Sequence, residues 1–295
     1  MSTTRSLFSE NFLRRLEHLR LVTRRPVAGH LRGGHRSRRT GSGMVFADYR
    51  QYASGDDTHH LDWGIFMRLD RLILRLFEEE ADLPVYLLVD ASASMAHGQP
   101  RKFDFARQIG AALAYLSLLN YDRVSVVAWS DGVAAELPMR RGRTQVWPLF
   151  RFLEGMEPAD GTDLAATLRG FFGASRTRGL VILLSDFLDR GAFDAAAHWL
   201  RQFRHEVVAF QVLSPEEMEP QLPDEAVLVD EETGASLALE ASADLLRDYR
   251  AALEEHCRGI EAQCRRQGWT YLLARTDAPF EDLMLGALRR EGVLR

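Results

Sequence analysis

Apolar and polar positions follow two different rhythms along the chain, and the change falls near residue 83. Beyond that point, short runs of valine, isoleucine and leucine take turns with segments whose apolar residues recur every three or four positions. The apolar runs are typical of strands buried on both faces. The segments with three- or four-residue spacing are typical of helices that cover a sheet. The pattern therefore predicts an α/β domain over residues 83–295, with a doubly wound, mostly parallel sheet and helices on both faces.

The apolar runs give the expected strands, and the segments between them give the expected helices. Strands are predicted at residues 85–90, 123–130, 133–139, 179–187, 205–214 and 269–274. Helices are predicted at residues 103–120, 145–156, 161–173, 193–204 and 243–267, and a last helix follows the final strand. A β-hairpin insertion is expected near residues 222–240, around the turn-forming sequence Glu232-Thr233-Gly234.

The first 82 residues do not share this rhythm. An amphipathic helix is predicted over residues 7–22, and the alternation from Leu72 to Phe77 predicts a strand. We therefore expect a basic helix or arm followed by a segment of short β elements over residues 1–82, and the α/β domain after it.

Arginine dominates the charge of the first 40 residues. This stretch holds ten arginines and two glutamates, a formal charge of about +8, whereas the whole chain carries −5. Two interpretations stay open, a solvated tail or a docking arm for an acidic partner. Nucleic acid is the weaker partner, because no aromatic residues interleave the arginines at stacking spacing. The arginines are Arg5, Arg14, Arg15, Arg20, Arg24, Arg25, Arg32, Arg36, Arg38 and Arg39.

The composition is that of a globular protein with a sizeable core, 46% hydrophobic and 27% charged. Cys257 and Cys264 stand seven positions apart in a predicted helix, about 10 Å along its axis and too far for a disulfide. The N-terminus lacks the apolar centre of a signal peptide, and the stretch from Ile109 to Leu119 is too short to span a bilayer. We therefore expect reduced thiols and a cytoplasmic protein.

Small oxygen-bearing side chains follow the strands and open one of the helices. DASASM starts with Asp90 at the end of a buried strand and continues with Ser92 and Ser94. GTDL places Thr162 before a helix, and LLSDF places Asp186 at the end of another strand. Ligands of open parallel sheets bind at the carboxyl ends of strands, so these side chains are expected to meet. Hydroxyls and carboxylates suit Mg²⁺ or Mn²⁺, and a further coordination position would accept a carboxylate of another protein.

Several alternatives stay open. A D-x-S-x-S sequence alone is usually a turn or helix cap, and the other two motifs can be a cap and a turn. A magnesium phosphohydrolase that uses Asp90 is the main rival, but Ser92 stands where that chemistry wants a second acid. Lys102 is the only lysine between Met95 and Asp186. The sequence contains neither the G-x-S-x-G motif of serine hydrolases nor a GxxxxGK[ST] phosphate-binding loop. A scaffold whose site no longer binds metal is the blander alternative.

The segment GDDTHHLDW holds a second set of possible ligands. They are Asp56, Asp57, Asp62 and the adjacent His59 and His60. A structural role is favoured, because Gly-Asp-Asp is good turn chemistry and adjacent residues of a strand face opposite ways. We expect Asp62 to bond backbone groups, Trp63 to pack, and Arg68 to pair with an acid.

DASASM, GTDL and LLSDF, in this order on this alternation of strands and helices, resemble the metal-ion-dependent adhesion site of von Willebrand factor A domains. In that family the hydroxyls meet the ion, and the two acids hold it directly or through water. The resemblance assigns these roles to Asp90, Ser92, Ser94, Thr162 and Asp186.

The stretch GSGMVFADYRQYASGDDTHHLDW, with Arg68 and RLFEEE, resembles the signature of the bacterial domain of unknown function 58 (DUF58) family. Members place this signature just before a von Willebrand A-like domain, and the resemblance spans roughly residues 28–215. His59 stands where the family usually has arginine, and Met67 where a small residue is usual. Many members begin with transmembrane helices, which this sequence lacks.

The resemblance implies a non-enzymatic adaptor that captures an acidic residue of a partner through a bound metal. It implies a partner of the MoxR-type AAA+ ATPase class and chaperone-like or complex-assembly work. No residue of the sequence names the ATPase, so this partner rests on family analogy.

Overall fold

The computed structural model describes residues 14–17, 19, 21, 44–53, 56, 58, 61–79, 83–159, 161–173, 177–189, 191–221, 223, 225–229, 236–240 and 242–294. The chain forms two compact units. The smaller unit comprises residues 26–82, and the larger one combines residues 1–25 with residues 83–295. The boundary near residue 82 falls where the hydrophobic rhythm of the sequence changes.

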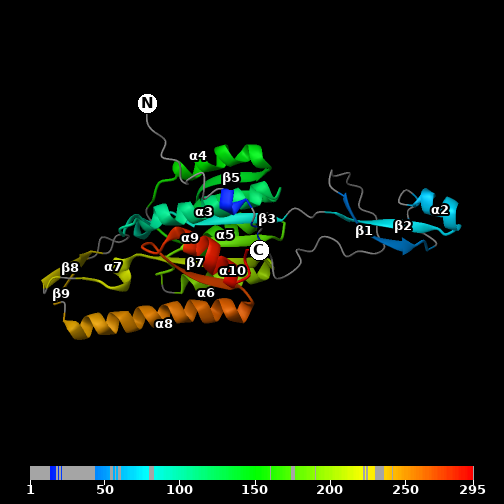
Figure 1. Cartoon of the computed structure of the whole chain (residues 1–295). Helices are drawn as coiled ribbons and strands as arrows, with labels where there is room; N and C mark the ends of the chain where they lie inside the picture. Colours follow the sequence, from blue (N-terminus) through cyan, green and yellow to red (C-terminus); the bar gives the residue numbers. More distant parts are fainter. Residues whose placement is uncertain are drawn as a thin grey trace, which may run out of the picture. The chain divides into compact units, whose positions relative to one another are not determined.

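In its described residues, the smaller unit contains a two-stranded sheet and one short helix (Figure 1). Strand β1 (Met44–Gln51) pairs antiparallel with β2 (Ile73–Glu79), and the register shifts between Phe46 and Asp48. Helix α2 (Trp63–Leu69) lies between them in sequence, and Asp62 caps it by accepting a hydrogen bond from the backbone N–H of Ile65. The backbone role expected for Asp62 is therefore confirmed.

The larger unit is built on a six-stranded sheet with the order β10-β7-β6-β3-β4-β5. Strands β3 (Pro84–Asp90), β4 (Arg123–Trp129), β6 (Leu180–Ser185), β7 (Glu206–Leu213) and β10 (Thr270–Arg275) run parallel. Strand β5 (Val133–Arg141) is the antiparallel edge. The mixed, mostly parallel α/β fold predicted from the sequence is confirmed.

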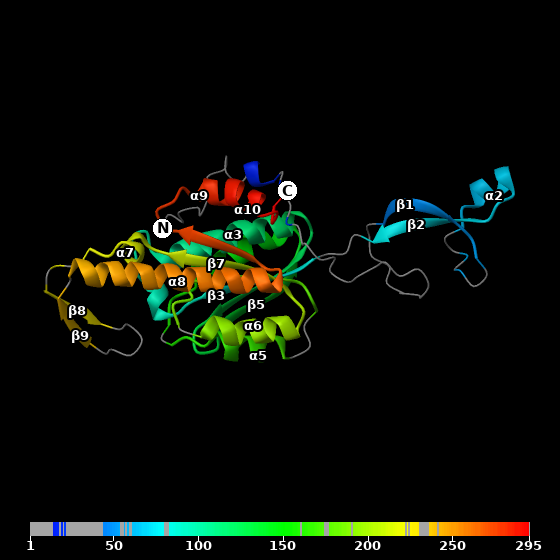
Figure 2. The ribbon, with the colours of Figure 1, turned by 90° about the horizontal axis from the view of Figure 1, so that it is seen from below.

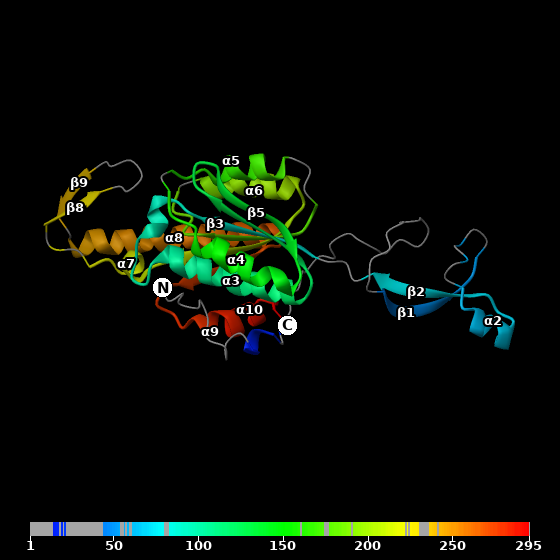
Figure 3. The ribbon, with the colours of Figure 1, turned by 90° about the horizontal axis from the view of Figure 1, so that it is seen from above.

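Helices cover both faces of this sheet, as Figures 2 and 3 show. Helices α3 (Lys102–Leu119) and α4 (Val146–Glu154) pack on one face, where Ile109, Leu113 and Leu149 are fully buried. Helices α5 (Leu164–Phe172), α6 (Ala192–Gln202) and α8 (Ala243–Gln267) cover the other face, where Leu168 and Cys264 are fully buried. Each face of the sheet therefore has its own hydrophobic core.

The remaining elements are short. Turns of 3-10 helix lie at η2 (Ala93–Ala96) and η3 (Arg143–Gln145), and α7 (Pro215–Met218) follows β7. The predicted hairpin insertion is β8 (Glu225–Val229) paired with β9 (Ser236–Glu240), between α7 and α8. The chain ends in α9 (Phe280–Asp282), the π-helical turn η4 (Leu283–Ala287) and α10 (Leu288–Arg290).

The described part of the arginine-rich segment packs on the larger unit. Leu16 and Leu19 are buried in the core that contains α3. The Tyr115 hydroxyl donates to Oε1 of Glu17 over 2.9 Å. This stretch therefore groups with the α/β unit and not with the β elements that follow it, because its leucines contribute to the α/β core. Arg14 and Arg15 remain exposed, and the other eight arginines lie outside the described residues.

Within the described ranges, no helix is long and apolar enough to cross a lipid bilayer.

Candidate functional site

The centre of the sheet contains the point at which the chain reverses its direction of travel. From β3 the chain moves to β4 and β5, and then returns to β6 on the other side of β3. Asp90 is the last residue of β3, and Asp186 directly follows the neighbouring strand β6. Ligands of doubly wound sheets bind at such a switch point, outside the carboxyl ends of the strands.

Asp90 ties the loop after β3 to the end of β6. It is 3% exposed, Oδ1 accepts a hydrogen bond from the backbone N–H of Ser92 over 2.9 Å, and Oδ2 accepts one from the Ser185 hydroxyl. Both oxygens therefore fix the positions of the two loops that carry the other acid and hydroxyls.

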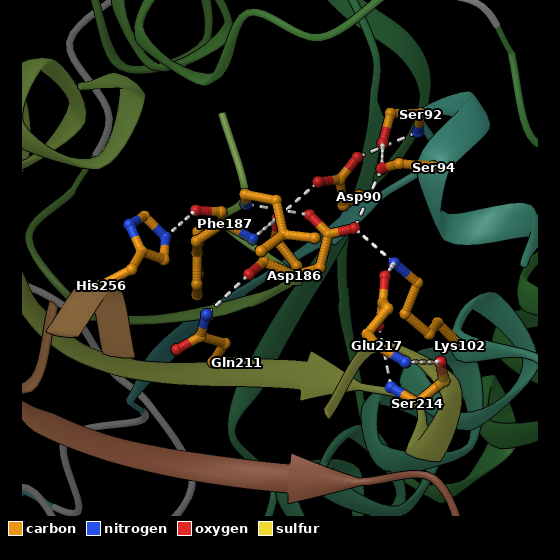
Figure 4. A network of polar contacts seen from close by, with 12 residues as sticks. Asp90, Ser92, Ser94, Lys102, Asp186, Phe187, Gln211, Ser214, Glu217 and His256 are labelled. Atoms are coloured by element: carbon orange, nitrogen blue, oxygen red, sulfur yellow. Dashed lines mark hydrogen bonds and ion pairs between the residues drawn. The ribbon is translucent and has the colours of Figure 1, made fainter. Parts of the chain in front are cut away.

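The hydroxyls of Ser92 and Ser94 continue this chain of oxygens toward Asp186 (Figure 4). Their Oγ atoms lie 3.1 Å apart, and the Ser94 hydroxyl donates to Oδ2 of Asp186 over 3.0 Å. The turn of 3-10 helix after Ser92 brings Ser94 to the same side as Ser92. Three of the predicted ligands thus form one hydrogen-bonded row.

The loop after β6 holds Asp186 in a constrained backbone conformation. The backbone N–H of Leu188 donates to Oδ1 of Asp186 over 3.2 Å, and Nε2 of Gln211 donates to its backbone carbonyl over 2.9 Å. Phe187 has a φ of 51°, an uncommon left-handed conformation for a bulky residue. Its carbonyl accepts a hydrogen bond from Nε2 of His256 in α8 over 2.7 Å. Groups on two other elements therefore fix this loop.

Thr162 reaches the site from the loop before α5. Gly161 has a φ of 82°, and Asp163 follows with its backbone N–H bonded to the carbonyl of Ser130 over 2.7 Å. Asp163 also caps α5 by accepting from the N–H of Ala166 over 2.7 Å. The neighbours of Thr162 therefore carry the structural bonds, and the helix-cap role considered for Thr162 belongs to Asp163.

All five predicted ligands line a single pocket of about 540 Å³. They are Asp90, Ser92, Ser94, Thr162 and Asp186. Trp129 also lines this pocket, and its buried indole N–H has no hydrogen-bond partner in the part of the chain that the structure describes. The structure thus brings together side chains that lie up to 96 positions apart in the sequence.

Lys102 belongs to this cluster, although no sequence motif predicted it. This first residue of α3 has no exposed surface, and its Nζ lies 2.6 Å from Oδ2 of Asp186. The ammonium also contacts Oε1 of Glu217 in α7, and Glu217 lines the same pocket. The one available signal was that Lys102 is the only lysine between Met95 and Asp186.

Burial and charge oppose each other at this cluster. Burial and the nearby charge of Asp186 raise the pKa of Asp90 to about 7. Burial alone would lower the pKa of Lys102, but the charges of Asp186 and Glu217 outweigh it and raise that pKa above its ordinary value. Lys102 is therefore a charged side chain inside the protein, held by two carboxylates.

The second set of possible ligands gives no comparable cluster. His59, His60 and Asp57 lie outside the described residues, while Asp56 pairs with Arg50 over 2.7 Å. Trp63 is 59% exposed, and the packing expected for it is limited to an edge-on contact with the ring of Phe66 in the described part of this unit. Among the residues with described positions, no three His, Cys, Asp or Glu side chains gather as a metal site would require. The five predicted ligands include only two acids, and the other three are hydroxyl side chains.

The fold and the pocket define an α/β protein with a charged pocket at the switch point of its sheet. The family model described as "Protein of unknown function DUF58" matches residues 48–258, and the chain belongs to this family. The match runs from β1 into α8 and therefore covers elements of both units.

Two mycobacterial relatives share this sequence pattern over long stretches. The uncharacterized protein Rv1480 of Mycobacterium tuberculosis is 29% identical over 293 residues, which cover 95% of this chain and 90% of that protein. The uncharacterized protein MAV169 of Mycobacterium avium is 32% identical over 151 residues, which cover 48% of this chain and 85% of that protein.

Solved structures resemble the chain more distantly. The conserved hypothetical protein BatB from Bacteroides thetaiotaomicron is 18% identical, with a TM-score of 0.45, over 71% of this chain and 96% of that one. An aerotolerance-related membrane protein from Bacteroides fragilis is 17% identical, with a TM-score of 0.43, over 71% and 98%.

Proposed function

We propose that the protein is a metal-dependent interaction module with a von Willebrand A-like domain. In this proposal the five pocket residues hold Mg²⁺ or Mn²⁺, and the pocket captures an acidic side chain of a partner protein. The single observation that carries the proposal is the hydrogen-bonded row of Ser92, Ser94 and Asp186 at the switch point, with Thr162 and Asp90 in the same pocket.

The donor set fits a hard divalent cation. Every candidate ligand atom is an oxygen, and two of the five residues are carboxylates. The Ser94 hydroxyl already donates to Asp186, and the Ser92 hydroxyl lies within hydrogen-bond distance of Ser94. Asp90, with both oxygens engaged in positioning loops, suits an indirect role through water, whereas Ser92, Ser94 and Thr162 suit direct contact. When bound, the ion would supply a coordination position for an oxygen from outside the protein.

Two further features support capture of a carboxylate. The pocket is large enough to admit a side chain beyond the five ligands. Trp129 lines the pocket, and its buried indole N–H has no partner among the described atoms, so a shift of this side chain on binding would add a donor for the second oxygen of a carboxylate. Neither feature requires the protein to break a covalent bond, so the proposed role is non-enzymatic.

The identity of the partner rests on the family resemblance. We propose a MoxR-type AAA+ ATPase that presents an aspartate or glutamate, with this chain as its adaptor in chaperone-like or assembly work in the cytoplasm. Pull-down of candidate ATPases with and without Mg²⁺ tests this part. Retention of an ATPase that is unchanged by removal of the metal would contradict it.

The metal site is tested by calorimetric titration of Mg²⁺ and Mn²⁺ into the full chain, with and without acetate. We expect binding that acetate tightens, and a loss of at least about tenfold in affinity in Thr162→Val, since one contact is removed. Thr167→Val is the matched control, because Thr167 lies in α5 beside the same loop but points into the core. Binding by Thr162→Val that equals the wild type would overturn the site.

A magnesium phosphohydrolase is the second candidate, and one observation favours it. Lys102 places an ammonium against the pocket-lining Asp186, and phosphoryl-transfer sites use such cations. Against it, both oxygens of Asp90 accept hydrogen bonds within the protein, and Ser92 stands where a second acid is needed. An aryl phosphate assay decides: metal-dependent turnover that is lost in Asp90→Asn and in Lys102→Met would replace the adaptor proposal.

A further inference from the structure

A buried ammonium lies where the proposed metal site borders α7. Nζ of Lys102 contacts Oδ2 of Asp186 at 2.6 Å and Oε1 of Glu217, as Figure 4 shows. The lysine side chain is only 1% exposed, so water does not solvate its ammonium group. A carboxylate from the loop after β6 and one from α7 therefore share one positive charge inside the fold.

The ammonium touches an atom of the proposed ligand set. Oδ2 of Asp186 accepts hydrogen bonds from both the Ser94 hydroxyl and the Lys102 ammonium. A cation that approaches the row of hydroxyls meets the same carboxylate from its other side. The positive charge of Lys102 therefore lies close to any divalent ion that Asp186 helps to hold, and like charges at such a distance repel strongly.

Glu217 is fixed in place for its part in this cluster. Its Oε2 accepts from the backbone N–H of Ser214 over 2.9 Å, and its backbone carbonyl accepts from the Tyr249 hydroxyl of α8 over 2.8 Å. Gly98, in the loop before α3, lies so close to Ser214 that a Cβ there would come within 2.6 Å of the serine Cβ. The start of α3 and the start of α7 thus pack against each other, which keeps Lys102 within reach of Glu217.

We propose that Lys102 is the resident cation of the adhesion site. It neutralises Asp186 when no metal is bound, and it competes with a divalent ion for that carboxylate. Glu217 acts in the opposite direction, because it adds a negative charge and gives the ammonium a second holder. This inference rests on the proposed metal site and names the two residues that set its affinity.

The same charges affect the capture of a partner. Asp90, Asp186, Glu217 and Lys102 together carry a formal charge of −2 when all are ionised. A divalent ion brings this cluster to zero, whereas the same cluster without the lysine would remain at −1 and repel an incoming carboxylate. Lys102 therefore lowers metal affinity and favours the approach of an acidic side chain.

Calorimetric Mg²⁺ titrations of the full chain test this inference in three proteins: wild type, Lys102→Met and Glu217→Gln. Lys102→Met is expected to bind Mg²⁺ at least about tenfold more tightly and to lose the tightening by acetate. Glu217→Gln is expected to bind Mg²⁺ at least about threefold more weakly. General damage to the fold would weaken binding in both variants, so the opposite directions are diagnostic.

The double variant Lys102→Met/Glu217→Gln protects the test against misfolding. It removes one charge of each sign, and it is expected to bind Mg²⁺ more tightly than Glu217→Gln alone. Thermal unfolding gives a second readout: excess Mg²⁺ should raise the Tm of Lys102→Met more than that of the wild type.

The outcomes separate the two proposals. Mg²⁺ binding by the wild type that Lys102→Met does not improve would overturn the inference and leave the metal site standing. Binding by Lys102→Met alone would support the inference, because the lysine then fills the site in the wild type. Absence of Mg²⁺ binding in both proteins would overturn the metal site and the inference together.

Discussion

The two ends of the central sheet both contain buried ionisable side chains, and the carboxyl end opens on the pocket of the five predicted ligands. At the amino end, His205 precedes β7 and is 2% exposed. Its Nδ1 accepts from the backbone N–H of Gly179 over 3.2 Å, and the ring of Phe172 lies 4.3 Å away between centroids. At the carboxyl end, Lys102 and Asp186 are equally buried, but their partners are other charged side chains.

The kind of partner separates structure from function in this comparison. His205 bonds a backbone N–H and packs among aromatic rings, so within the described structure it has no charged partner that an ion could replace. It is held as a neutral core residue. Asp186 lines the pocket, so in the proposed site Lys102 and Asp186 would exchange each other for an ion or a carboxylate. Burial alone therefore does not make a side chain a candidate for the site, whereas a buried charged partner beside a pocket does.

The largest expected effect lies at the amino end. Phe172→Ala removes a ring that packs on Tyr86 and His205, and we expect a loss of about 3–5 kcal/mol in the free energy of unfolding. Chemical denaturation measures the loss, and Mg²⁺ affinity of the folded variant should stay as in the wild type. Trp147→Ala is the control, because Trp147 is 68% exposed, and its effect should stay within about 0.5 kcal/mol.

If folded Phe172→Ala lost Mg²⁺ affinity as well as stability, the separation between the two ends of the sheet would be wrong. It would mean that the two ends of the sheet are coupled through the strands and do not act separately. Phe172 belongs to the same hydrophobic core as Leu164, which lies beside the pocket. The measurement therefore tests whether a change in this core reaches the site.

The second effect is the pH dependence that His205 imposes. Burial lowers its pKa from 6.5 to about 4, so between these values the unfolded chain binds a proton that the folded chain does not. Stability from this residue is therefore lost as the pH falls, by about 2 kcal/mol between pH 7 and pH 5. Urea denaturation at both pH values of wild type and His205→Asn measures it. The difference between the two proteins should shrink at pH 5, and a constant difference would contradict the assignment.

The sequence predicts the framework of the carboxyl end well, for reasons that lie in single residues. Helix α8 spans the predicted residues 243–267, because Ser242 caps its start and Gly268 ends it with a φ of 70°. Asp90 and Asp186 come together because parallel strands place their carboxyl ends at one end of the sheet. These are local or topological rules, and a sequence carries them directly.

Other features depend on contacts that no local pattern records. Lys102 reaches the site because its long side chain, at the first position of α3, turns inward. Asp186 and Glu217 are far from it in the sequence, and no helical or strand periodicity connects the three residues. Helix α2 follows a stretch rich in turn-forming residues, which hides it in the sequence pattern. Asp62 caps its first turn. The metal itself and the partner stay predictions, since oxygen ligands are compatible with both an occupied and an inactive site.

The smallest effect compares two threonines, one just before helix α5 and one within it. Thr162 lines the pocket, whereas Thr167 is 1% exposed in α5 and its hydroxyl has no hydrogen-bond partner within the described structure. Valine has the same shape without the unsatisfied oxygen, so Thr167→Val should raise the free energy of unfolding by up to about 1 kcal/mol. Thr162→Val should not stabilise the metal-free protein, because its site is polar and half-buried. Thermal unfolding of both variants without metal measures the pair, and equal stabilisation would mean that Thr162 is a core residue and not a ligand.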